Sequence, residues 1–243
     1  MKKLICLLIT ALIAAWAVSC KKDSTGSKEE EKINPIPEDA VDLGIVMTRT
    51  DGTSYKLYWA TCNLGATKPE EYGGYYAWGE TETKSSYSWS NYSYGTSANG
   101  PFSEYNTKSD YGLVDNKKVL DTGENGDDAV SKARGGKWRM PTDAEWTALL
   151  EQCGWSWTND FNGTGVAGRV VASSVTGRSI FLPAAGSWGS SLGADGISAD
   201  YWSSSLDVDR PYQAYHIQFD SNSFKRNHNN RYFGFSIRPV YEE

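Results

Sequence analysis

The chain has 243 residues, a net charge of −6, and an unusual content of 10 Trp, 15 Tyr and 24 Gly. The acidic balance argues against nucleic acid as the main partner, because phosphate recognition needs a basic surface. Abundant aromatic residues and glycine, with few long aliphatic runs, favour short strands and turns packed on aromatic side chains over long helices.

Residues 1–19 have the pattern of a cleaved export signal. Lys2 and Lys3 begin it, and an apolar run of 15 residues up to Val18 is too short for a membrane span. The run closes on Ala-Val-Ser-Cys at residues 17–20, which resembles the lipobox of bacterial lipoproteins. That resemblance implies cleavage before Cys20 and acyl chains on Cys20 that bind the protein to a membrane. An ordinary secretory signal is the alternative.

Residues 20–40 are rich in Lys, Glu, Ser and Pro, so they are predicted to form a disordered tether. Without the two signal lysines, 22 of the 24 basic residues remain against 30 acidic ones, a net charge of about −8. Residues 41–243 suit one domain with a substantial core. Its two cysteines, Cys62 and Cys153, are consistent with one disulfide or with two free thiols.

The first strand is predicted over residues 54–60, where Tyr55, Leu57 and Trp59 alternate after an Asp-Gly hairpin signal at residues 51–52. Residues 75–111 form a long stretch without a clear period, which is uncommon unless it has a role. Its aromatic side chains are expected to pack over the core rather than to line a binding face: Tyr87, Trp89, Tyr92 and Tyr94.

A short helix is predicted after Thr142, because Thr142 and Glu145 form a capping-box pattern. The helix would present one apolar face made by Trp146, Leu149, Leu150 and Cys153. Gly154 is expected to cap its C-terminal end.

Further strands are predicted at residues 180–183, 215–219 and 235–240. In the second of these, Tyr215, Ile217 and Phe219 would face the core and His216 would face outward. Residues 206–233 are mostly Asp, Asn, Ser, Arg, Tyr, His and Phe, without Glu, Met, Trp, Thr, Cys or Gly. This is the chemistry of a contact surface, and an ordinary polar loop-and-strand segment is the alternative.

Six motifs in order along residues 41–240 resemble one family. They are residues 59–66, 76–80, 136–146, 181–186, 201–205 and 234–240, of which Gly-Lys-Trp-Arg-Met-Pro-Thr-Asp-Ala-Glu-Trp at 136–146 is the clearest. They are similar to the C-type-lectin-like fold in its formylglycine-generating-enzyme branch, and more closely to the FISUMP domains of bacterial lipoproteins. The resemblance implies an α+β, C-type-lectin-like fold with short strands, one or two short helices and long loops.

The same C-terminal frame resembles the variable proteins of diversity-generating retroelements, whose lectin-like domains end in a stretch mutated at adenines. Residues 206–212, 221–224 and 226–230 fit the repertoire that asparagine codons produce. Gln213, Gln218 and Lys225 do not fit it. The resemblance makes residues 206–233 a candidate variable segment.

Catalysis and metal binding are not expected. The oxidase branch of the lectin-like fold relies on cysteines in its C-terminal region, and this chain has none after Cys153. The histidines, His216 and His228, have no cysteine nearby for a zinc site. Three acids match no calcium loop and are predicted to be solvated: Asp207, Asp209 and Asp220.

We therefore expect an outer-membrane lipoprotein at the cell surface, with no enzymatic activity and no cofactor, that binds a protein or glycan ligand. The expected scaffold is Trp59, Trp138, Trp146, Trp202, Tyr215, Ile217, Phe219, Phe235 and Ile237. The expected contact residues are Asp207, Asp209, Arg210, Tyr212, His216, Phe224, Arg226, His228, Asn230 and Tyr232. A structural or adhesive component of a surface assembly, and an accessory carbohydrate-binding lipoprotein that uses Trp89 and Tyr92, remain as alternatives.

Overall fold

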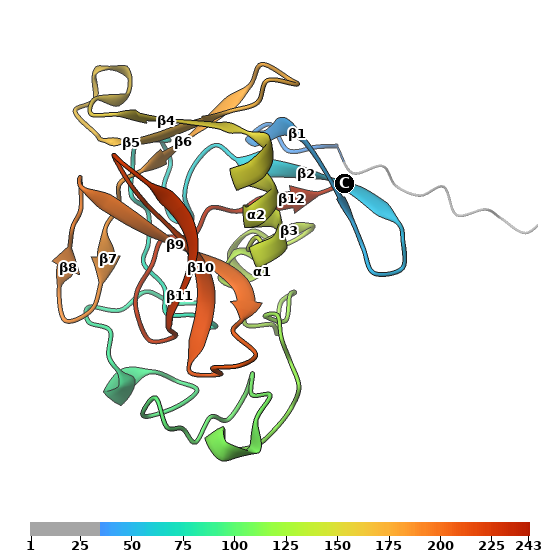
Figure 1. Cartoon of the computed structure of the whole chain (residues 1–243), viewed down its shortest axis with the longest axis vertical. Coiled ribbons are helices and arrows are strands. Elements are labelled where there is room, and N and C mark those ends of the chain that lie inside the picture. Colours follow the sequence, from blue (N-terminus) through green and yellow to red (C-terminus); the bar gives the residue numbers. More distant parts are fainter. Residues whose placement is uncertain (1–34) are drawn as a thin grey trace, which may run out of the picture. The chain divides into compact units, whose positions relative to one another are not determined.

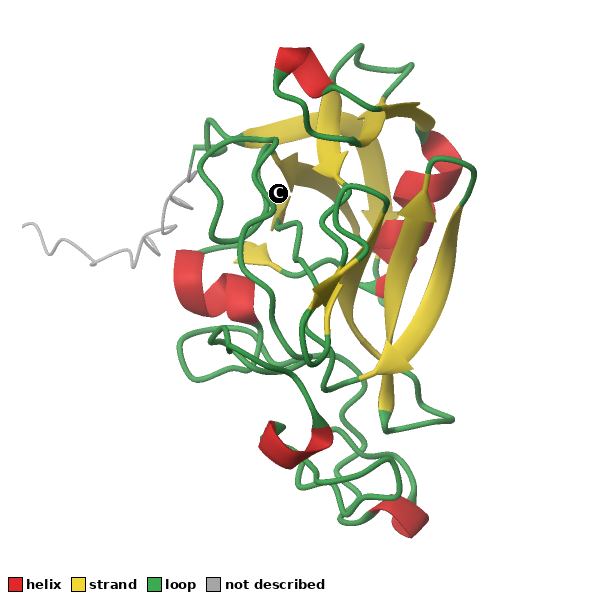
Figure 2. Cartoon of the chain, turned by 90° about the vertical axis from the view of Figure 1, so that its left-hand side faces the viewer, coloured by secondary structure: helices red, strands yellow, loops and turns green. Residues whose placement is uncertain are grey.

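The computed structural model describes residues 35–243, so the predicted signal peptide, the lipidation at Cys20 and most of the tether lie outside the described residues. Residues 36–243 fold as one unit of the α+β class. Figure 1 shows its sheets in the upper and central parts of the unit and a loop-rich lower part built mainly from residues between about 80 and 125. Figure 2 shows the same division, with few and short helices.

One sheet joins the two ends of the domain. Its strand order is β1-β2-β12-β3, and each neighbouring pair is antiparallel. The bounds are β1 Ala40–Thr48, β2 Ser54–Ala60, β12 Val240–Glu242 and β3 Trp138–Arg139. The prediction of β2 is confirmed, and the Asp-Gly turn connects it to β1.

Three further antiparallel sheets complete the fold. The first contains β4 Gly154–Thr158, β5 Gly168–Ala172 and β6 Ser179–Pro183, and the second pairs β7 Ser187–Trp188 with β8 Leu192–Gly193. The third has the order β11-β10-β9, with β9 Ser198–Leu206, β10 Gln213–Asp220 and β11 Phe224–Asn230. Three 3₁₀ turns cover Trp89–Asn91, Ser109–Tyr111 and Phe161–Gly163.

The predicted helix is α2, Asp143–Gln152, and its capping box is present. Thr142 accepts the N–H of Glu145 at 3.2 Å, and Glu145 accepts the N–H of Thr142 at 2.7 Å. The Glu145 carboxylate is fully buried and also pairs with Arg139 at 2.5 Å. Gly154 does not cap the helix in a left-handed conformation, because Cys153 is the C-cap residue after Gln152 and Gly154 begins β4. The other helix, α1, covers Ala129–Arg134.

The predicted scaffold forms the core, except that Tyr215 is only half-buried. Trp59 packs on Trp146 with ring centroids 4.6 Å apart, and Trp202 packs on Phe235 at 4.2 Å. Within residues 75–111, the prediction of packing is confirmed for Tyr87 and Tyr92, which are buried. The predicted strand at 235–240 is shorter than expected: Phe235 and Ser236 make isolated bridges and regular pairing begins at Val240.

Cys62 and Cys153 are both free in the structure. Of the two alternatives that the sequence left open, the structure therefore shows two free thiols and no disulfide. Partial burial raises the pKa of the Cys153 thiol.

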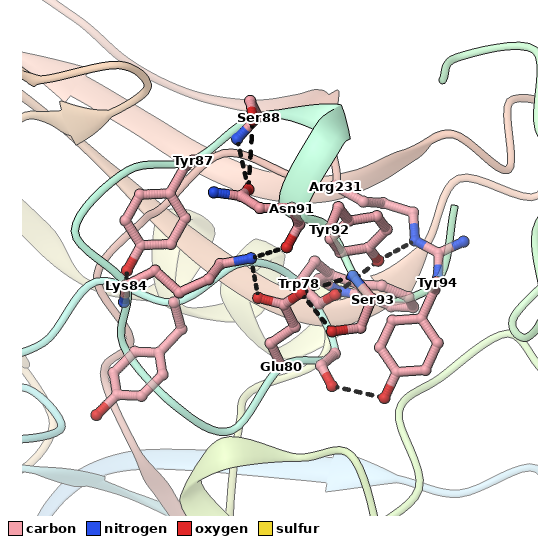
Figure 3. Close-up of polar contacts among 12 residues, drawn as sticks. Trp78, Glu80, Lys84, Tyr87, Ser88, Asn91, Tyr92, Ser93, Tyr94 and Arg231 are labelled. Carbon is pink, nitrogen blue, oxygen red and sulfur yellow. Dashed lines mark hydrogen bonds and ion pairs between the residues drawn. The ribbon is translucent and has the colours of Figure 1, made fainter. Parts of the chain in front are cut away.

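Two fully buried arginines connect distant parts of the chain. Arg238 donates to the carbonyls of Ala60, Thr61 and Phe181 and to the side chain of Asn63 at 2.8–2.9 Å. Arg231 lies at the end of the candidate variable segment and donates to four oxygens at 2.8–3.2 Å: the Tyr92 hydroxyl and the carbonyls of Glu104, Tyr105 and Pro211. Figure 3 shows Arg231 beside Tyr92, Tyr94 and Trp78.

We predict that Arg231→Met lowers the free energy of unfolding by about 3 kcal/mol, because it leaves several buried acceptors without a donor. Arg226→Met is the matched control, since Arg226 is a surface arginine of the same segment, and it should cost less than about 1 kcal/mol. Urea denaturation of the full-length proteins measures both values. Equal losses would show that the burial of Arg231 carries no special stability.

Candidate functional site

The ten predicted contact residues divide into a surface group and a buried group. Strand β11 is the outer strand of its sheet, and it places Phe224, Arg226, His228 and Asn230 on one face by simple alternation. Asp209 is exposed in the turn before β10. We call the β11 residues and this turn (residues 208–210) the β11 surface.

Phe224 lies at the N-terminal end of β11. It remains 40% exposed although its ring stacks on Trp155, with centroids 5.1 Å apart and planes inclined by 16°. The Arg169 guanidinium lies 5.1 Å from the Phe224 ring centroid. An exposed aromatic face held in one orientation is a suitable anchor for a ligand, because little side-chain entropy is lost on binding.

Arg226 is fixed at the middle of the surface. Its Nε lies 2.5 Å from Oδ1 of Asp143, and its guanidinium covers the half-buried Tyr215 ring at 4.0 Å from the centroid. The hydrogen bond with Asp143 raises the pKa of Arg226, so the charge is permanent. The strand therefore presents a preorganised cation.

His228 is held between Arg210 and Gln213. Nη2 of Arg210 lies 2.7 Å from Nε2 of His228, and Nδ1 of His228 lies 2.8 Å from Oε1 of Gln213. A guanidinium only donates, so Nε2 accepts and the neutral imidazole carries its proton on Nδ1. Desolvation and the charge of Arg210 lower the pKa of His228 below its usual value of 6.5. The imidazole is therefore a fixed, neutral part of the surface near pH 7.

The placement of His216 on the contact surface is wrong. Its side chain is buried between Trp202 and Phe235, at 5.7 and 5.0 Å between ring centroids. The reason is the position of β10, which is the central strand of its sheet and is covered on both faces. Alternation alone predicts one solvated face, as in a strand with a single buried side.

Asp207 is also buried, at 1% exposure, and it is wrong as a contact residue. Its carboxylate accepts the backbone N–H groups of Asp209 and Arg210 and pairs with Nε of Arg210 at 2.9 Å. Asp207 therefore fixes the turn that carries Asp209 and orients Arg210 toward His228. Asp207 therefore contributes to the β11 surface indirectly, by holding these two residues in place.

Tyr212 and Tyr232 are half-buried and pack on the long aromatic loop. Tyr212 lies 5.7 Å from Tyr111, and Tyr232 lies 5.0 Å from Trp89. Each side chain can contribute to both packing and contact. The two rings mark the place where the β11 surface meets the loop of residues 75–111.

Trp89 and Tyr232 border a hollow of about 600 Å³. Every residue that lines it is uncharged: Tyr87, Ser88, Trp89, Ser187, Gly189, Ser190, Ser191, Gly193, Tyr232 and Phe233. Aromatic faces beside several hydroxyl groups suit a neutral, hydroxyl-rich molecule. Tyr92 does not line the hollow, because its side chain is buried, with its ring edge-to-face against Trp89 at 5.7 Å between centroids.

Sequence reasoning missed three features of the segment. The buried Arg231 looks like a surface residue in a polar run, and its acceptors lie 20 to 139 residues away along the chain. Asn227 and Asn229 are absent from the expected contact residues, yet each side chain accepts the backbone N–H of the residue that follows it, at 3.0 and 2.8 Å. The recurrence of Asn at positions 227 and 229 of a strand is the sequence signal that could have indicated these side chain–backbone hydrogen bonds.

Comparison of the chain with protein-family models, curated proteins and solved structures found no match. Within residues 35–243, no three His, Cys, Asp or Glu side chains gather in a way that could hold a metal ion. No helix in that same range has the length and hydropathy to cross a bilayer.

We predict that His228 makes stability depend on pH. Because its folded-state pKa lies below 6.5, the unfolded chain binds the proton more tightly, so stability falls as the pH drops through 6.5 toward the folded-state pKa. His228→Gln should weaken this dependence between pH 7.5 and pH 5. Urea denaturation at both pH values tests it, and the difference between the two proteins removes the contribution of the carboxylates. An equal loss in both would contradict the assignment.

Proposed function

We propose that the domain is a C-type-lectin-like recognition module of the FISUMP kind, on a lipid anchor at Cys20 and displayed at the outer membrane. It binds a protein or glycan ligand without catalysis. The short antiparallel strands, two short α-helices and long loops support this assignment. So does the capping box at Thr142, which lies within the clearest family motif.

The β11 surface is the single observation on which the proposal depends. Polar and aromatic side chains are held there by defined partners, on a strand supported by a deeply packed sheet. Fixed polar groups and a fixed aromatic anchor reduce the entropic cost of binding. The exposed side chains of β11 lie outside the buried core that Trp202, Ile217 and Phe219 form in the same sheet.

We predict that the triple variant K225T/R226T/H228T remains folded and binds its ligand at least roughly tenfold more weakly. Threonine keeps the strand propensity of β11. The matched control is K137T/E151T, which replaces two exposed residues outside the segment. Glycan arrays and arrays of envelope proteins, probed with the full-length protein, identify the ligand. Circular dichroism checks that the triple variant and the control are folded. Retained binding by the triple variant would refute the assignment of the surface.

Burial also sharpens the proposal that residues 206–233 are diversified. We predict that a near-copy of this segment lies in the neighbouring DNA beside a reverse-transcriptase gene. It should differ at codons for surface positions such as Asp209, Arg226 and Asn230, and agree at Asp207 and Arg231. Sequencing the locus tests this. Differences at Arg231 as frequent as those at Arg226 would contradict the prediction, and the absence of a copy would leave an undiversified binding domain.

The neutral hollow beside Trp89 favours a second candidate function, carbohydrate recognition. Pyranose rings stack their C–H faces on aromatic side chains, and serine hydroxyls can exchange hydrogen bonds with sugar hydroxyls. Trp89→Ala would then abolish signals on a glycan array and leave protein ligands of the β11 surface bound.

A further inference from the structure

The free edge of β11 has two unlike halves. The N–H of Asp220 donates to the carbonyl of Ser223, and the N–H of Arg231 donates to the carbonyl of Tyr212. These bonds fix the alternation of the antiparallel pair, so the backbone groups of residues 225, 227 and 229 face β10. Those of residues 224, 226, 228 and 230 face away from the sheet.

The second half of this edge is already occupied by side chains. Asn227 accepts the outward N–H of His228 at 3.0 Å, and Asn229 accepts that of Asn230 at 2.8 Å. In the first half, no described residue accepts the outward N–H groups of Phe224 and Arg226. Residues 221–226 are all exposed, so a strand can approach this half. The open half of the edge is therefore Phe224–Arg226.

Unpaired strand edges accept extended peptides, whose backbone supplies affinity and whose alternate side chains supply specificity. Antiparallel pairing with a second copy of this chain about Lys225 is disfavoured, because it would place two lysines opposite each other. A different peptide chain fits this edge if its acidic residues face Lys225. Its apolar residues would then lie beside Phe224 and Trp155, on the opposite face of β11.

We propose that the open half of the β11 edge binds an extended peptide strand of alternating apolar and acidic residues. This inference rests on the proposed function and gives its protein ligand a chemical class and a binding mode. The asparagine side chains end the pairing after Arg226, because they satisfy the next outward N–H groups.

The probe is a fluorescent octapeptide of alternating valine and glutamate, titrated into the full-length protein and followed by anisotropy. We expect the matched valine–lysine peptide to bind at least roughly tenfold more weakly. A valine–glutamate peptide with N-methyl groups on the amides of one edge should also lose binding, since it can no longer pair with the strand. This comparison leaves the protein unaltered.

Variants of the protein test the same edge. Arg226→Pro removes an outward N–H together with the Arg226 side chain and its pair with Asp143, and it should abolish binding, although an edge strand tolerates proline. Arg226→Ala removes the same side chain but keeps the N–H, so it should lose less. Asn227→Ala frees the N–H of His228 and should tighten binding roughly fivefold, the value of one added hydrogen bond. Amide NMR spectra check that each variant is folded.

Equal binding of the acidic and basic peptides, no binding of either, or no effect of N-methylation would overturn the proposal. If K225T/R226T/H228T loses the ligand selected on the arrays and the peptide tests fail, recognition by the side chains of the β11 surface is still supported. Only the pairing of a peptide with the strand edge is then refuted. Tightening by Asn227→Ala together with loss by Arg226→Pro would support the proposal.

Discussion

The buried guanidinium of Arg231 is the constraint on which the rest of the candidate site depends. It joins the end of β11 to the aromatic loop through the Tyr92 hydroxyl and the carbonyls of Glu104 and Tyr105. Within the described residues no carboxylate pairs with it directly. Its charge is balanced by carbonyl oxygens and by ring faces, including Trp78 at 4.8 Å and Phe102 at 5.0 Å. The rings of Tyr94 and Tyr105 also lie within 6.0 Å of the guanidinium, and Asp127 accepts the hydroxyls of both tyrosines.

This arrangement explains why a loop of nearly forty residues can be ordered without regular secondary structure. Its backbone polar groups need partners, and the buried Arg231 satisfies two of its carbonyls, those of Glu104 and Tyr105. The tyrosines provide apolar area and a hydroxyl at the same position. The loop in turn covers the end of β11, so the surface strand and the loop stabilise each other.

The sequence predicted the elements whose signals are local. The capping box at Thr142 and the alternation around Leu57 and Ile217 each involve neighbours within a few residues, and all three were found. His216 was misplaced because its burial depends on β9 and on Phe235, which a single strand pattern does not contain. Arg231 was overlooked for the same reason: its partners come from residues 92–105 and from Pro211. The predicted contact residues on β11 share one face, as strand alternation requires. Asp207 is polar but buried, so polarity alone does not predict that a residue is exposed.

The order of the strands has a consequence for how the molecule is made. Strand β12 lies between β2 and β3, and it follows residues 206–233 in the chain. The sheet that unites both ends of the domain therefore cannot close until the ribosome has passed the whole segment. A chain that ended within residues 206–233 would lack this central strand and the buried Arg238, so β2 and β3 would have no strand between them. The last residues of the chain are therefore needed to complete the sheet that contains its first strands.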